Sequence, residues 1–500
     1  MAARWNARAL LALVAATTGC GVEPAAVVAR PLILIGVDGL EWELLLRFAG
    51  EEQLPNLSAL AKDGLAAKLD TLEETLSPLI WTTIATGKRP EKHGITAFSF
   101  EDESGTAFLF TSLHRKSKAL WNLFTDAGLT TDVFGWWCTF PAEEIQGEMV
   151  AQTSTRAQID IASGSRIWKG NYLAGLPRQT WPDELSARMD AHARALAEQV
   201  IAGADPAAAA FGKPAHAVSK LDERLFGLVR SAFYADVLFR EAALDVLKEK
   251  RPFDALLVYF GVVDVASHLF WRPMEPQKYD HPPSAESIAD FGRVIRDSYR
   301  WVDEAIGEIR RLAPDADLLV VSDHGFYAAS LHDEFKDDGP RHDSGKHTQS
   351  PPGVLIAAGP GFRRDPLPPG ATADELKTIG RVEDLLPTLL ARAGLPYGED
   401  MDGRPLRRLL ADEVLRAHPI GSVKSHEDDA WRVSREEALA RFRDFERNFE
   451  TLLRQMDEKN LETLRALGYT GAGLNEAGPE DDPPPKEPPA KDSPQDRKPR

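Results

Sequence analysis

Six carboxylate and imidazole side chains stand beside apolar runs of this 500-residue sequence. They are Asp38, Asp264, His268, Asp323, His324 and His347. Oxygen and imidazole nitrogen ligands suit zinc, and also manganese or iron, where thiolates are absent. Six protein ligands are enough for two metal ions, and a pair about 4 Å apart can stabilise both the attacking and the leaving oxygen in phosphoryl transfer. The pattern therefore predicts two divalent metal ions, with zinc as the first choice, and a phosphate ester as the substrate.

A serine stands at the start of a helix-like run in "TLSPLIWTTIATGKRPEKHGI" (75–95). Ser77 before Pro78 has the pattern of an ordinary helix cap with proline at the first helical position. The same hydroxyl suits a nucleophile, because a metal can hold its oxygen as an alkoxide and a helix N-terminus attracts anions. Taken alone, each of the six ligands also has a structural explanation as a turn, cap or surface residue. Their joint occurrence favours the catalytic interpretation.

Residues so far apart in the sequence need a scaffold that brings them together. Continuous apolar runs predict buried strands near 31–38, 130–137, 253–264, 315–325 and 353–361. Helical patterns fall between them at 54–64, 119–128, 289–312 and 380–393. In an open α/β sheet the loops at the carboxyl ends of parallel strands converge on one crevice. We therefore expect an α/β fold, a three-layer α/β/α sandwich with a mainly parallel central sheet.

The alternation of these predicted strands and helices divides the chain into parts. The predicted parts are a signal peptide at 1–20, a tether at 21–30, a catalytic domain at 31–150 and 249–410, a helical cap insertion at 151–248, a C-terminal helical segment at 411–470 and a disordered tail at 471–500. The insertion is Ala-rich and poor in strand signals, and we expect it to cover the site and select the substrate. The tail is rich in proline and charge.

The first twenty residues have the pattern of an export signal. Arg4 and Arg8 precede the apolar run "ALLALVAA" (9–16), which is too short for a permanent transmembrane helix. The ending "TTGC" looks like a bacterial lipoprotein signal that is cut before Cys20, whose thiol would carry lipid. Plain secretion and an uncleaved anchor are the alternatives. We therefore expect a protein of the cell envelope that is lipid-anchored to a bacterial membrane.

The formal net charge of −18 argues against nucleic acid as the main partner, because phosphate backbones attract basic surfaces. It does not exclude a phosphate ester substrate, since bound metal ions reverse the local field. Cys138 is the second of two cysteines, and we expect it to be a small buried apolar side chain.

Together the motifs "GVDG", "SPLIWTTIATGKRPEKHGI", "GVVDVASH", "SDHG" and "HTQSPPGVLIAAGPG" resemble the alkaline phosphatase superfamily. The nearest branch is that of the type I phosphodiesterase/nucleotide pyrophosphatase proteins, with their bacterial phosphohydrolase or phosphomutase group. The resemblance implies one metal on Asp38, Ser77, Asp323 and His324, and another on Asp264, His268 and His347. It also implies that Ser77 attacks phosphorus to form a covalent phospho-enzyme, which water then hydrolyses.

The sequence departs from this family at one functional position. Nucleotide pyrophosphatases carry an asparagine three residues after the nucleophile, and Ile80 stands there instead. Thr82, Thr83 and Lys88 are candidates to bind the phosphoryl oxygens in its place. The sulfatase branch is disfavoured, because "SPLIW" does not match its C/S-x-P-x-R motif.

The sequence thus predicts an exported, metal-dependent hydrolase of phosphoric diesters or monoesters. One alternative is a transferase of the same superfamily, which moves a phospho-head group to an acceptor hydroxyl. Another is a non-catalytic envelope lipoprotein that retains the fold. We expect His93 to be a structural histidine, and His332, Asp333 and His342 to belong to a solvated loop.

Overall fold

The computed structural model describes residues 30–101, 107–152, 171–215, 220–332 and 344–455. The predicted export signal with Cys20 and the predicted tail at 471–500 lie outside the described residues, as do Asp333 and His342. In the described part of the chain, no helix is long and apolar enough to cross a membrane.

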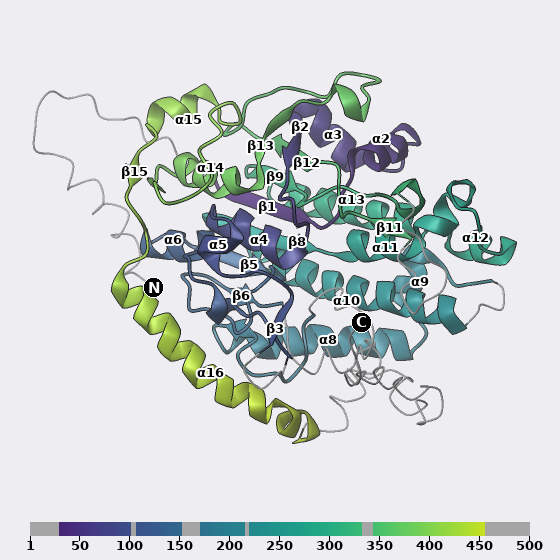
Figure 1. The fold of residues 1–500 in the computed structure, drawn as a ribbon, viewed down its shortest axis with the longest axis horizontal. Coiled ribbons are helices and arrows are strands. Elements are labelled where there is room, and N and C mark those ends of the chain that lie inside the picture. Colours follow the sequence, from purple (N-terminus) through teal and green to yellow (C-terminus); the bar gives the residue numbers. More distant parts are fainter. Residues whose placement is uncertain (1–29, 102–106, 153–170, 216–219, 333–343, 456–500) are drawn as a thin grey trace, which may run out of the picture.

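The core of the protein is a nine-stranded sheet with the order β13-β2-β12-β9-β1-β8-β5-β6-β7. Its strands are β1 (Leu32–Val37), β2 (Leu65–Asp70), β5 (Thr131–Phe134), β6 (Met149–Val150), β7 (Thr180–Trp181), β8 (Ala255–Phe260), β9 (Asp317–Val321), β12 (Gly353–Ala358) and β13 (Thr378–Arg381). β1 lies in the middle and pairs in parallel with β8 and β9 (Figure 1). Only β12 and β7 run against the others, so the predicted mainly parallel sheet is confirmed.

Helices cover both faces of this sheet. Ile33, Ile35 and Val37 of β1 face a cluster that includes α2 (Trp42–Gly50), α3 (Pro55–Asp63), α8 (Leu185–Ile201), α10 (Lys220–Lys248), α11 (Val262–Met274) and α13 (Val294–Leu312). Leu32 and Leu34 face the other cluster, with α4 (Ser77–Thr86), α6 (Leu120–Asp126) and α14 (Leu385–Arg392). Because both faces are buried, the strands are continuously apolar, and the predicted three-layer sandwich is confirmed.

Segment 151–248 is helical, as predicted, over α8, α9 (Pro206–Phe211) and α10. Its strand β7 extends the main sheet, however, and α10 packs against β8, α11 and α13. Asp236 of α10 also accepts hydrogen bonds from the Gly261 and Val262 amides at the start of α11. The longest helix of the segment therefore lies in a helical layer of the sandwich rather than in a separate cap, because its apolar face is buried there.

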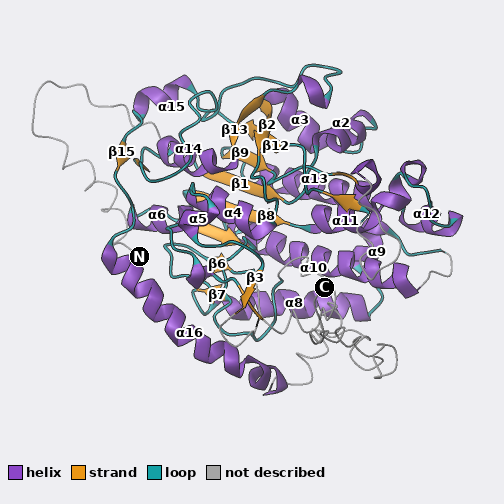
Figure 2. Cartoon of the chain, viewed as in Figure 1, coloured by secondary structure: helices purple, strands orange, loops and turns teal. Residues whose placement is uncertain are grey.

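Shorter elements complete the chain. The helices are α5 (Pro90–His93), α12 (Ala285–Phe291), α15 (Asp412–Ala417) and α16 (Asp429–Gln455), and the two-stranded pairs are β3 (Ser99–Glu101) with β4 (Ala107–Leu109), β10 (Tyr327–Ala328) with β11 (Gly345–Lys346), and β14 (Tyr397–Gly398) with β15 (Ser422–Val423). Helix α16 runs along the outside of the molecule (Figure 2). It packs through the buried Phe442, whose ring lies 5.8 Å from that of Phe140.

Candidate metal centre

Five of the six predicted ligands follow the carboxyl ends of three adjacent parallel strands. Asp38 comes directly after β1, and Asp323 and His324 come just after β9. Asp264 and His268 lie on α11, which begins one residue beyond the end of β8. β8, β1 and β9 are neighbours in the sheet, so their ends share one edge.

The sixth ligand, His347, reaches the same edge from the other direction. It precedes β12, and β12 runs antiparallel to β9. The start of an antiparallel strand lies at the carboxyl ends of its neighbours, so a ligand that precedes this strand can meet ligands that follow the others. The structure thus brings all six predicted ligands together.

One group of potential ligands consists of Asp38, Asp323 and His324, which are all buried and whose ligand atoms lie within 4.8 Å of one another. His324 Nε2 lies 3.6 Å from Asp38 Oδ1 and 3.3 Å from Asp323 Oδ2. These three atoms have no hydrogen-bond partner among the described residues. The second oxygen of each carboxylate is engaged by the protein. Asp38 Oδ2 accepts from Tyr259 and Trp81, and Asp323 Oδ1 accepts from the Gly39 amide.

The second group consists of Asp264, His324 and His347, with ligand atoms again within 4.8 Å. His268 lies beside it, with its Nε2 3.0 Å from His347 Nε2 and 3.5 Å from Asp264 Oδ1. His324 belongs to both groups, and its ring stacks on that of His347 with a centroid separation of 4.0 Å. The two groups are therefore adjoining parts of one centre.

The hydrogen bonds of the three imidazoles assign their tautomers. His268 Nδ1 and His324 Nδ1 each lie 3.1 Å from a backbone carbonyl, of Gly345 and Gly325 respectively. Thr75 Oγ1 donates to the carbonyl of His347 at 2.6 Å, so it accepts from His347 Nδ1 at 3.1 Å. Each Nδ1 therefore carries the proton, and each Nε2 presents a lone pair to the centre, as metal-binding histidines do.

Burial disfavours the charged forms of the side chains at this centre. Burial, together with the nearby Asp38 and Asp264, raises the pKa of Asp323 well above its usual range. Burial also lowers the pKa of His324 below its ordinary value, so this imidazole does not supply a compensating charge. Divalent cations would remove both penalties, because they favour ionised carboxylates and neutral imidazoles. The donor types, the atoms without partners and the tautomers all fit such ions.

Ser77 is the first residue of α4 and is buried. The N-cap residue of this helix is Leu76, and no side chain caps the helix, so the structure gives Ser77 no capping role. The Leu79 and Ile80 amides both donate to the Leu76 carbonyl, and proline has no N–H. The helix end therefore attracts an anion mainly through its dipole. Thr75, which accepts a hydrogen bond from His347 Nδ1, links this segment to the predicted ligands.

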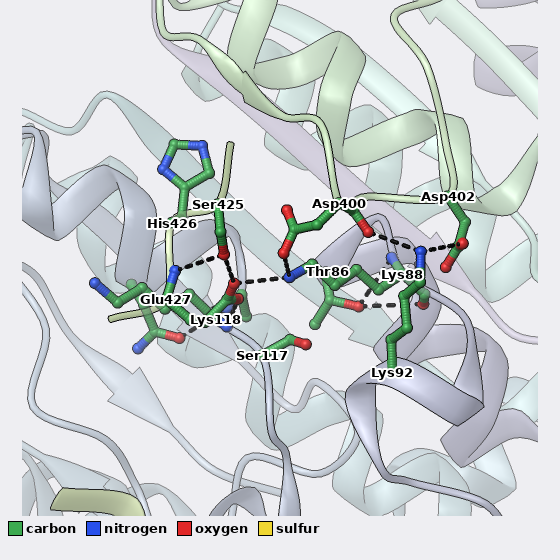
Figure 3. Close-up of polar contacts among 12 residues, drawn as sticks. Thr86, Lys88, Lys92, Ser117, Lys118, Asp400, Asp402, Ser425, His426 and Glu427 are labelled. Carbon is green, nitrogen blue, oxygen red and sulfur yellow. Dashed lines mark hydrogen bonds and ion pairs between the residues drawn. The ribbon is translucent and has the colours of Figure 1, made fainter. Parts of the chain in front are cut away.

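Lys88 does not reach the metal centre. It lies just beyond the C-terminal end of α4, and the ten residues of this helix separate it from Ser77 by about 15 Å. Its Nζ is bound by Asp400 Oδ2 and Glu427 Oε2, each at 2.7 Å (Figure 3). The prediction that Lys88 binds phosphoryl oxygens is wrong, because this buried ammonium group pairs with the carboxylates of Asp400 and Glu427.

Thr82 and Thr83, which are predicted with Lys88 to bind the phosphoryl oxygens, are both buried in the protein. Thr83 Oγ1 donates to the Leu79 carbonyl and lies 3.1 Å from His93 Nε2. Thr82 is buried beside Cys138, whose thiol pKa rises to about 12 through burial.

His93 is buried and accepts a hydrogen bond from the Ile95 amide, and burial followed by the charge of Arg115 lowers its pKa to about 3. It is therefore neutral, in agreement with the predicted structural role.

Two residues that hold predicted ligands in place, Tyr259 and Thr75, are not predicted from the sequence. Tyr259 lies in β8, and burial and Asp38 raise its pKa well above its usual range, so it stays a neutral donor to Asp38. Thr75 orients His347 across 272 positions of sequence. The sequence signal for Tyr259 is the one hydroxyl in an otherwise apolar strand, "ALLVYF". No local pattern in the sequence indicates the role of Thr75.

Comparison with known proteins gives a family match over residues 32–399, to the family model described as type I phosphodiesterase / nucleotide pyrophosphatase. No curated protein matches the chain. Similar solved structures include murine ectonucleotide pyrophosphatase / phosphodiesterase 5, with 13% identity, a TM-score of 0.44 and coverage of 76% of this chain and 100% of that one.

Two other similar structures have different activities in their descriptions. A 2-O GAG sulfatase has 14% identity and a TM-score of 0.44, with 79% of this chain and 76% of that one covered. Phosphonoacetate hydrolase from Sinorhizobium meliloti 1021, in complex with phosphonoformate, has 18% identity and a TM-score of 0.34, with 62% and 58% covered. The family model spans most of the sequence and all six predicted ligands, so this chain belongs to the type I phosphodiesterase / nucleotide pyrophosphatase family and is a phosphoric ester hydrolase.

Proposed function

We propose that the chain hydrolyses phosphoric mono- or diesters through a covalent phosphoserine on Ser77, at a centre that holds two divalent cations. One observation carries the proposal. Three imidazoles are held by their Nδ1 atoms and direct their Nε2 atoms toward the carboxylates of three aspartates at one edge of the sheet. Oxygen and nitrogen donors without a thiolate favour zinc, with manganese or iron as alternatives.

The residues that would hold the cations are Asp38, Asp323 and His324 for one and Asp264, His268 and His347 for the other, with the Ser77 hydroxyl at the first. When bound, the cations would supply the positive charge that lowers the pKa of the Ser77 hydroxyl and offsets charge on the phosphoryl oxygens.

The chemistry proceeds in two displacements at phosphorus. In the first, Ser77 Oγ forms a bond to phosphorus, the bond from phosphorus to the oxygen of the organic group breaks, and that oxygen leaves as an alcohol after taking up a proton. In the second, a water oxygen attacks phosphorus, the bond to Ser77 Oγ breaks, and the serine hydroxyl regains its proton. The helix dipole of α4 favours the anionic phosphoryl group in both steps.

The test compares wild-type protein with Ser77→Ala. Metal content is measured, together with turnover of bis-p-nitrophenyl phosphate and p-nitrophenyl phosphate. We expect about two metals per chain in both proteins, and a loss of turnover by at least about a thousandfold in the variant. Ser434→Ala is the matched control, because Ser434 is an exposed serine on α16 whose hydroxyl donates to the Trp431 carbonyl of its own helix. A metal-loaded Ser77→Ala protein with wild-type turnover would contradict the proposal.

Lipid anchoring is a separate part of the proposal and rests on the sequence alone. The basic residues, short apolar run and "TTGC" ending support lipidation of Cys20. With Cys20→Ser, we expect the protein to move from the membrane fraction to the soluble fraction of the expressing bacterium. A variant that stays in the membrane fraction would contradict the anchor.

A further inference from the structure

A cavity of about 420 Å³ adjoins the metal centre. Its walls come from the 70–75 loop after β2, the 348–352 segment before β12, and Arg381 at the end of β13. Thr75 is part of this wall, and the same residue accepts the hydrogen bond from His347 Nδ1. Thr75 lies on the Nδ1 side of His347, away from the centre, but it also precedes Ser77 by two residues, and Thr348 of the opposite wall directly follows His347. The cavity therefore borders the segments that carry Ser77 and His347, close to where a group attached to phosphorus would lie.

The lining of the cavity is polar. The residues that define its character are Asp70, Glu73, Thr348, Gln349, Ser350 and Arg381. Among the described residues that line it there is no aromatic ring, and the apolar ones are a single leucine and a single proline. A nucleobase gains its binding energy largely by stacking on aromatic side chains, and an acyl chain requires an apolar wall. Neither is provided here.

The balance of charge in the cavity is acidic. Arg381 Nε donates to Glu383 Oε1 at 2.9 Å, and Arg89 binds the same carboxylate, so Glu383 offsets the charge of Arg381 only in part. The two acids Asp70 and Glu73 nevertheless outnumber Arg381 in the lining. No ion pair joins Asp70 or Glu73 to the residues that the structure describes. Two such carboxylates repel a second phosphate and accept hydrogen bonds from hydroxyl groups.

We propose that the organic group of the substrate is a small polyol, whose hydroxyls donate to Asp70 and Glu73 and bond to Gln349 and Ser350, and not a nucleoside or an acyl chain. This inference rests on the proposed function and adds the substrate class.

The test uses three p-nitrophenyl phosphodiesters that differ only in the second alcohol, which is glycerol, propanol or thymidine. All release p-nitrophenolate, so the metal-loaded full-length protein can be compared on kcat/KM alone. We expect the glycerol ester to exceed the propyl ester by about tenfold, which corresponds to one or two hydrogen bonds. We expect the thymidine ester to be no better than the propyl ester.

The variant Glu73→Ala should reduce the preference for glycerol over propyl to about threefold or less, and Gln349→Ala should act in the same direction. Glu74→Ala is the matched control, because it is the adjacent exposed glutamate and does not line the cavity. It should keep the wild-type preference within about twofold.

Four outcomes would overturn the inference. Turnover of all three esters without a preference, or a faster thymidine ester, removes the polyol class while leaving the proposed function intact. Glu73→Ala and Gln349→Ala proteins that both keep the wild-type preference place the polyol elsewhere. A metal-loaded wild type that cleaves neither the three diesters nor p-nitrophenyl phosphate overturns the proposed function, and this inference with it, whereas cleavage of p-nitrophenyl phosphate alone overturns only this inference.

Discussion

His347 differs from the other two imidazoles in how it is held, because a side chain rather than a backbone carbonyl accepts from its Nδ1. Thr75→Val removes this acceptor and keeps the shape of the side chain. We expect a 10- to 100-fold loss of zinc affinity, which is about the usual effect of removing such a partner. The measurement is competition with a chromophoric chelator.

Thr75→Ser is the control for this prediction, because its hydroxyl can still accept from the imidazole. It should bind zinc within about threefold of wild type. If both variants bound zinc equally well, His347 would not depend on Thr75 for its orientation.

Glu41 gives the metal-free protein a defined pH dependence. Burial raises its pKa from 4.5 to about 7, although the Glu43 and Leu44 amides donate to its carboxylate. The folded chain therefore holds a proton that the unfolded chain has released, so the free energy of unfolding falls as pH rises from about 4.5 to about 7. We expect a loss of about 1 kcal/mol per pH unit in this window, measured by urea unfolding in excess chelator.

Replacing Glu41 by glutamine removes this titration. The difference in unfolding free energy between Glu41→Gln and wild type should therefore change across the same pH window. A constant difference from pH 4.5 to 7 would show that Glu41 titrates alike in both states.

At the residue scale, the sequence indicates the six side chains that the structure brings together, but not the residues that support them. Each ligand stands beside an apolar run, which is a local signal. Lys88 was misassigned because its partners, Asp400 and Glu427, lie more than 300 positions further along the chain. Interactions between segments so distant leave no pattern in one sequence.

At the scale of the elements, the sequence likewise predicts where a strand lies but not the direction in which it runs. The strand that follows His347 was predicted from its apolar run, but its antiparallel direction was not. A strand buried on both faces is apolar whichever way it runs. Its direction depends on its neighbours β9 and β2, which precede it by about thirty and nearly three hundred residues.

Helix α10 allows a test of whether segment 151–248 supports the helix that carries two of the predicted ligands. Asp236 is fully buried and accepts hydrogen bonds from two amides at the start of α11, the helix that carries Asp264 and His268. We expect Asp236→Ala to lower the free energy of unfolding by about 2 kcal/mol and to weaken zinc binding, since both effects follow from a loosened α11. Denaturant unfolding and zinc titration measure them.

Asp205→Ala is the matched control, because Asp205 caps the start of α9 in the same manner and its bonds lie within segment 151–248. It should lower stability without changing zinc affinity. Equal zinc affinities in all three proteins would contradict a role for α10 in supporting the site. The idea that segment 151–248 selects the substrate stays a prediction.

At the scale of the whole molecule, Lys88 joins the end of α4 to two distant parts of the chain, through a half-buried ion pair with Asp400 and a buried one with Glu427 (Figure 3). Lys88→Met leaves the buried Glu427 without this cation, and we expect a loss of about 3 kcal/mol of unfolding free energy. Because Lys88 is remote from Ser77, the KM for a small phosphate ester should stay within about twofold of wild type. Steady-state kinetics on the folded variant checks this.

Lys92→Met is the comparison, because Lys92 pairs with Asp402 in a more exposed setting. It should cost less than about 1 kcal/mol. A stable Lys88→Met protein with a much higher KM would restore Lys88 as a substrate ligand.

The central position of β1 also affects how the sheet forms while the chain is being synthesised. β1 is made first, yet its two neighbours begin at residues 255 and 317, so it stays unpaired while more than two hundred further residues are synthesised. Such distant pairing slows folding and leaves an apolar segment exposed meanwhile. The newborn chain must therefore be shielded from aggregation until β9 has emerged, and a polypeptide released before that point cannot complete its sheet.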